Sequence, residues 1–254
     1  MSKLLSSEFI RVLKSRLFWF CTGFLILFLC LNTIYVYSNP AFADIHKLLR
    51  NFYLYNNICI ALVSSVFTGM FIGTEYDECT IRNKILIGHS RLNVYASYLV
   101  TCITACFSMY CIALCIEFLF GLFITGFPDT TLIRLLFDFF CILCAISAVV
   151  SIVLFLAVLC QKKASGSTCG ILLMLIMQIW TESMVFSLSY EEVEGAQKAR
   201  YIFLVHLFPT GYLSEILTGN LWLENSPSLP VWVLITFAVS SLLGAFVFCK
   251  KDLK

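Results

Sequence analysis

The stretch "GTEYDECTIRNKILIGHSRLNVYASYLV", residues 73–100, is the longest polar interruption in the first 160 residues of a chain that is otherwise mostly apolar. Three acidic and three basic side chains lie in it, and Gly88-His89-Ser90 separates its two halves. Long apolar runs precede and follow it. The role of its charges therefore depends on what these apolar runs form.

Composition assigns the chain to the membrane. Its 254 residues are 60% hydrophobic and only 13% charged, with a mean hydropathy of +0.92. Soluble domains are about one quarter charged. The net charge of +2 is not gathered on one long polar segment, which argues against nucleic-acid binding. We expect a multi-pass protein of the cell membrane.

Six runs without charged residues define the expected crossings. About 20 apolar residues cross the hydrocarbon core as a helix, whereas barrel strands would appear as shorter alternating segments. We predict an all-α integral membrane protein with six transmembrane helices in a single domain, residues 1–254. The approximate spans are 17–37, 53–74, 92–125, 132–160, 164–186 and 229–249, with an outer loop at 187–228.

The basic residues predict the orientation. Twelve of the seventeen Lys and Arg residues lie in the N-terminal segment, after the second and fourth spans, and in the C-terminal tail. The positive-inside rule places these segments, and so both termini, in the cytoplasm. Residues 1–16 interleave apolar and charged side chains, a pattern typical of an amphipathic helix at the membrane interface. The alternative is an ordinary basic anchor for the first span.

The connection at residues 75–91 has the pattern of a helix, a turn and a second helix. We expect Asp77 to cap a short helix that runs through Ile85, with Ile81 and Ile85 on one face. Gly88 should end this helix, and Ser90 should cap the helix that becomes the third span. A short amphipathic helix with aliphatic side chains suits a groove on a partner protein. The alternative is a solvated loop.

The segment "EYDECTIRNKILIGHSRLNVYASYLV", residues 75–100, resembles the first cytoplasmic loop of ABC-2 type transporter permeases. An acidic-aromatic start, a Thr-Ile step, a basic residue, aliphatic residues and then Ser-Arg recur there. The similarity extends to the amphipathic start, the six spans and the segment "FPTGYLSEILTGN" at 208–220. It implies the ABC-2 architecture, also called type V exporter-like. Cys79 stands where many relatives carry Gly.

In that family the loop is a coupling helix that seats in a cleft of an ATP-binding subunit. The resemblance therefore implies that Ile81, Arg82, Ile85 and Leu86 contact an ATPase, while Glu75 is braced by a basic residue such as Arg11. No G-x-x-x-x-G-K-[ST] phosphate loop occurs in the chain. ATP and Mg²⁺ should therefore be bound by a separate partner chain, and this chain should bind no cofactor itself. Six spans also imply a dimer with a second permease subunit.

Three further residues are candidates for the translocation path or its exit. Glu117 interrupts the third span, where a charge is costly and tends to face the bundle interior. Its alternative role is a bond to a neighbouring helix or to outer water. Pro209 and Glu215 lie in a segment, 208–223, that is apolar enough to re-enter the membrane but too short to cross it. The alternative there is a simple interfacial loop.

The chain carries no recognisable catalytic motif. His46, His89 and His206 lie on three separate segments, and neither H-E-x-x-H nor G-x-S-x-G occurs. Cys141-x-x-Cys144 lacks the second pair that a structural zinc site needs, so we expect free thiols and no metal. The predicted function is the permease subunit of an ATP-driven exporter in contact with membrane lipid. The alternative is a non-transporting sensor or immunity scaffold bound to an ATPase.

Overall fold

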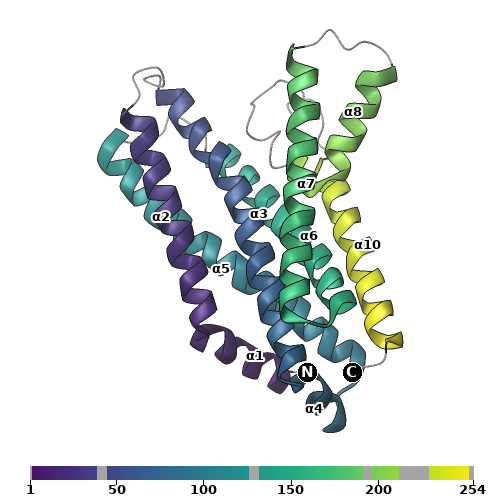
Figure 1. Ribbon diagram of the computed structural model, residues 1–254. Coiled ribbons are helices and arrows are strands. Elements are labelled where there is room, and N and C mark those ends of the chain that lie inside the picture. Colours follow the sequence, from purple (N-terminus) through teal and green to yellow (C-terminus); the bar gives the residue numbers. More distant parts are fainter. Residues whose placement is uncertain (1, 39–44, 126–131, 191–195, 212–228, 252–254) are drawn as a thin grey trace.

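The computed structural model describes residues 2–38, 45–125, 132–190, 196–211 and 229–251, and these ranges contain helices and no strand (Figure 1). The prediction of an all-α membrane protein is confirmed. The helices are α1 (Ser2–Lys14), α2 (Arg16–Ser38), α3 (Ile45–Asp77), α4 (Thr80–Leu86), α5 (Arg91–Thr125), α6 (Leu132–Cys160), α7 (Lys163–Tyr190), α8 (Ala196–Leu207) and α10 (Leu229–Lys250).

Each expected span falls inside one of these helices. Among the described residues, α3, α5, α6, α7 and α10 each contain a segment long and apolar enough to cross a membrane, and the bent pair of α1 and α2 is a sixth candidate when it is counted as one span. The expected outer loop at 187–228 is partly helical. It includes the last turn of α7 and all of α8, which packs beside α10 through an edge-to-face contact of Phe203 with Trp232.

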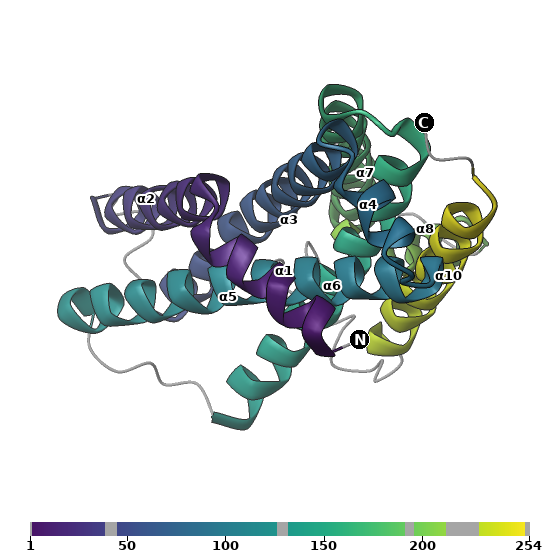
Figure 2. The ribbon, with the colours of Figure 1, turned by 90° about the horizontal axis from the view of Figure 1, so that it is seen from below.

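A bend of 58° separates α1 from α2. The backbone N–H of Ser15 donates to the carbonyl of Val12, and the Ser15 hydroxyl accepts from the N–H of Phe18 at 3.3 Å, so Ser15 caps α2. On α1, Leu4, Glu8 and Val12 form one buried stripe at helical spacing. This stripe packs against α5, which α1 crosses at the end of the bundle (Figure 2). The amphipathic pattern thus serves packing as well as the membrane surface.

The centre of the bundle is α6. It contacts α3, α5, α7 and α10, and small or β-branched residues such as Ala145, Ala148 and Val149 are buried along it. In lipid, helix association depends on close van der Waals packing because apolar surface gains little by leaving lipid tails. Small side chains on α6 let several neighbours approach at once. This places the core around α6 rather than on one face of it.

Helices α3 and α7 pack with their backbones almost in contact. A Cβ atom added to Gly69 on α3 would lie 2.7 Å from the Cα of Ser167 on α7, which is too close for two carbons. Gly73, one turn further, faces Lys163 in the same way. The G-x-x-x-G spacing in α3 therefore forms a smooth surface for α7.

Both chain ends lie at the same end of the bundle as α4 (Figure 1). Basic side chains fasten helix ends there. A guanidinium nitrogen of Arg91 donates to the carbonyls of Cys249 at 2.9 Å and Lys251 at 3.0 Å, at the end of α10. The ammonium of Lys251 donates to the carbonyl of Leu159 at the end of α6. These cations match the partial negative charge of helix C-termini.

Candidate functional site

The site is α4 and the polar cluster that fixes it to the bundle. Cys79 precedes α4 with a left-handed φ of 55° and provides no side-chain cap. The prediction that Asp77 caps this helix is wrong, because Asp77 is still the last residue of α3. Instead, the Thr80 hydroxyl donates back to the carbonyl of Glu75 at 3.0 Å. A tight turn of only two residues therefore joins α3 to α4.

The other end of α4 follows the expectation from sequence. The helix ends at Leu86, and Gly88 has a φ of +104°, which favours glycine because no Cβ is present to clash. The N–H of Asn93 donates to the Ser90 hydroxyl at 3.3 Å, so Ser90 caps α5. The predicted order of a helix, a turn and a second helix in residues 75–91 is therefore confirmed. The first of these helices begins at Thr80, later than the sequence predicts.

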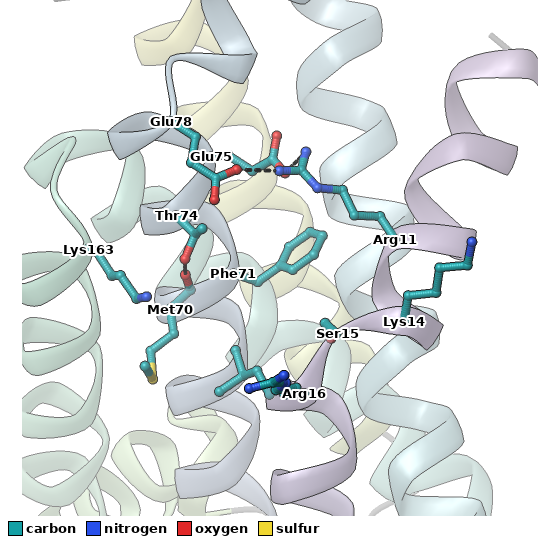
Figure 3. Close-up of a pocket in the computed structure, with 11 residues that line it drawn as sticks. Arg11, Lys14, Ser15, Arg16, Met70, Phe71, Thr74, Glu75, Glu78 and Lys163 are labelled. Atoms are coloured by element: carbon teal, nitrogen blue, oxygen red, sulfur yellow. Dashed lines mark hydrogen bonds and ion pairs between the residues drawn. The ribbon is translucent and has the colours of Figure 1, made fainter.

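Glu75 is the centre of the cluster, with only 1% of its side chain exposed. Its Oε2 accepts hydrogen bonds from the hydroxyls of Thr80 at 2.5 Å and Tyr98 at 2.6 Å. Its other oxygen pairs with Arg11, the ion pair that the family resemblance implies (Figure 3). One buried carboxylate thus contacts α1, α4 and α5 from its place at the end of α3.

Lys84 is the second centre, on the inner face of α4. Its ammonium donates to Glu75 at 2.9 Å, to the hydroxyl of Tyr98 at 2.7 Å and to Glu8 on α1. It also lies 4.6 Å from the centre of the Tyr98 ring, within reach of a cation–π interaction. Burial raises the pKa of Glu8, and the bond to Lys84 opposes that effect. Lys84 therefore joins two carboxylates from different helices.

We call Glu8, Arg11, Glu75, Thr80, Lys84 and Tyr98 the α4 bracket. Its charges balance, since two carboxylates face one guanidinium and one ammonium. Charges buried in low dielectric are tolerated when they are paired and hydrogen-bonded in this way. Sequence analysis missed Glu8, Lys84 and Tyr98. A signal for Glu8 was present, because it is an acid at the middle of the stripe formed by Leu4 and Val12.

Only some of the residues expected to contact an ATPase lie on the outer face of α4. Arg82 is exposed, and Leu86 and its neighbour Ile87 are 74% and 79% exposed. Ile81 is 2% exposed, and Ile85 is half-buried and packs against the core. Both isoleucines do share one face, as expected, but that face holds α4 to the bundle. Ile87, which the sequence analysis did not select, belongs to the outer face.

The three candidate path residues fall only in part within the described residues. Glu117 lies on α5, and its side chain is outside the described residues, as is the whole of Glu215. Pro209 is buried and lies two residues after α8, a helix in the part of the bundle remote from α4 (Figure 1). Their roles in a translocation path stay predictions.

The fold and the site define a polytopic membrane protein whose surface helix is braced by three others. Residues 4–181 match the family described as ABC-2 family transporter protein, and no curated protein matches the chain. The match covers well over half of the sequence, and the chain belongs to this family. It is a membrane-embedded permease subunit of an ABC transporter.

Proposed function

We propose that this permease exports a substrate across the cell membrane, driven by a separate ATP-binding subunit that docks on α4. The exposed surface of α4 carries the argument. Leu86 and Ile87 present adjacent apolar side chains at the end of the bundle, and Arg82 is exposed on the same short helix. Aliphatic anchors beside a cation suit a groove with an acidic rim. ATP and Mg²⁺ belong to the partner in this proposal.

The α4 bracket supports a mechanical role for this contact. A displacement of α4 acts on Lys84 and Thr80, which are bonded to Glu75 on α3 and, through Lys84, to Glu8 on α1 and Tyr98 on α5. Closure of the ATP-binding subunits would therefore move these helices as a body, as in rigid-body switching. The permease supplies no chemistry and converts closure at α4 into a change of access.

Two features of the assembly complete the proposal. The six crossings favour a second permease subunit, identical or related, so that the path lies between two bundles. The end that carries α4, both termini and Arg91 faces the cytoplasm, where ATP is available. Exposed apolar side chains on α2, α7 and α10, such as Phe20, Ile179 and Leu242, are then in contact with lipid or with the second subunit.

The test uses the tagged full-length chain purified from its native membrane. We expect a stoichiometric chain with a P-loop and ATPase activity to co-purify, and the double substitution Leu86→Asp, Ile87→Asp to reduce its recovery at least tenfold. Asn93→Asp, which also introduces an aspartate at an exposed position, on α5, is the control and should retain the partner. Undiminished recovery with the double variant would contradict docking on α4. A pure preparation without any ATP-binding chain would favour a sensor or scaffold.

A further inference from the structure

A cavity lies beside the bend between α1 and α2, next to the α4 bracket. It has a volume of about 370 Å³ and is bounded by the end of α1, the start of α2, the last turns of α3 and the start of α7 (Figure 3). This volume is within the range of ligand sites in proteins. The cavity shares Arg11 and Glu75 with the bracket, and its lining includes no residue of α4.

The charges around the cavity are unequal. Glu75 and Glu78 line it, but both are already paired with Arg11, at 2.7 Å in the case of Glu78. Lys14, Arg16 and Lys163 also line it, and none of these three has an acidic partner among the described residues. Figure 3 shows Lys163 reaching from α7 toward Thr74 and Met70 on α3. Arg16 on α2 and Lys163 on α7 therefore line the cavity without an acidic partner among the described residues, while the Lys14 ammonium points away from them (Figure 3).

Two helices begin at the same cavity. Arg16 is the first residue of α2 and Lys163 is the first residue of α7. The first N–H groups of a helix lack partners within the helix, and its dipole favours an anion at that end. The Ser15 side chain satisfies only the N–H of Phe18. The backbone dipoles and the side-chain charges thus favour the same ligand, an anion.

The remaining wall is apolar and lies at a membrane interface. Leu17, Met70 and Phe71 line the cavity, and the exposed indole of Trp19 lies one turn into α2. Interfacial Trp and basic residues mark the depth of lipid headgroups. Basic pockets between membrane helices are known to hold anionic headgroups. The cavity therefore offers a cationic part for phosphate beside an apolar part for chains or carbon atoms.

We propose that this cavity is a binding site for a phosphate-bearing anion held by Arg16 and Lys163. The ligand is either the headgroup of an anionic phospholipid or a soluble phosphate compound. The bound phosphate bridges the starts of α2 and α7 and offsets the positive charge of Arg16 and Lys163. This site is independent of whether α4 docks an ATPase.

The test is native mass spectrometry of the full-length chain in detergent, titrated with dioleoyl phosphatidylglycerol or with dioleoyl phosphatidylcholine. We expect the first bound phosphatidylglycerol to be at least tenfold tighter than phosphatidylcholine. The double substitution Arg16→Gln, Lys163→Gln should remove this preference, whereas Lys162→Gln, next to the site but outside it, should change it less than twofold. Arg16→Lys, Lys163→Arg keeps both charges and should restore binding, which separates charge from misfolding.

Inorganic phosphate and glycerol 3-phosphate, added at about 1, 10 and 50 mM, distinguish a phospholipid headgroup from a soluble phosphate compound. Over this range the added anions compete with the bound ligand for the cationic side chains. If they fail to displace the lipid, the ligand is a phospholipid headgroup. If they bind the wild-type chain and not the double Gln variant, the ligand is a soluble phosphate compound. Equal binding of the two lipids together with no binding of either phosphate overturns the proposal. An equal loss of binding in Lys162→Gln also overturns it.

Discussion

Two glutamates three residues apart at the end of α3 have very different surroundings. Glu75 is 1% exposed and contacts Arg11, Thr80, Lys84 and Tyr98, whereas Glu78 is 53% exposed and contacts Arg11 alone. Removing one member of a buried ion pair leaves its partner charged and poorly solvated. Removing one member of an exposed pair has little effect because water replaces it.

We expect Glu75→Gln to lower the free energy of unfolding by about 3 kcal/mol, since Lys84 would remain charged and largely buried. Glu78→Gln is the matched control and should cost less than about 1 kcal/mol. Thermal unfolding of the two purified variants in the same detergent measures the difference. Equal shifts in midpoint temperature would show that the bracket contributes no more than an exposed ion pair.

The backbone conformation of Cys79 is one that glycine adopts more easily than cysteine does. Its φ of 55° is left-handed, where a Cβ is close to the following carbonyl oxygen at a cost of about 1–2 kcal/mol. Glycine has no such cost but is more flexible when unfolded. We expect Cys79→Gly to stabilise the chain by about 1 kcal/mol. Cys79→Ala keeps the Cβ and should be neutral in the same melting assay; an equal gain from both would contradict the backbone argument.

At the scale of elements, α4 cannot be stable by itself. A helix of seven residues is far shorter than the length at which isolated helices form in water. Its order depends on Ile81, buried in the bundle, and on Lys84 in the bracket. The sequence predicts that this helix exists and which residues share a face. It does not reveal that the isoleucine face turns inward, because both faces carry aliphatic residues.

The contact between α3 and α7 depends on two glycines, Gly69 and Gly73. Gly23 in α2 provides a matched control for Gly69. Gly69→Ala would place a methyl group 2.7 Å from the Cα of Ser167, so we expect a loss of about 1–3 kcal/mol as the helices separate. Gly23 has no atom within 4 Å of an added Cβ, and Gly23→Ala should be neutral or slightly stabilising. Unfolding in detergent compares them. If both substitutions were harmless, the close approach would not contribute to stability.

At the scale of the whole molecule, the two termini and α4 share one end of the bundle (Figure 1). We expect this end to be cytoplasmic, because most Lys and Arg residues belong to segments that meet there. Green fluorescent protein fused to the C-terminus of the full chain should then fluoresce. Alkaline phosphatase at the same position should be inactive, because it needs an oxidising compartment to form its disulfides. An active phosphatase fusion would reverse the orientation.

The sequence by itself determined that the chain is an all-α membrane protein with several apolar helices, and where the polar connection lies. Uncharged runs of sufficient length report the crossings directly, since a backbone without water must satisfy its hydrogen bonds within a helix. The turn residues Gly88 and Ser90 were also readable, because their preferences are local. The pairing of Glu75 with a basic residue of α1 came from the family resemblance, and the structure contains that ion pair.

Only the tertiary structure decided which residues meet. Lys84 bonds to Glu8 across 76 positions, and Arg16 and Lys163 line one cavity although they lie on different helices. Tertiary packing also decided that Ile81 is inside and Ile87 outside. The physical reason is that periodicity fixes how a helix divides into faces. Which neighbour covers each face depends on non-local contacts, such as the approach of α7 to Gly69, that no single segment encodes.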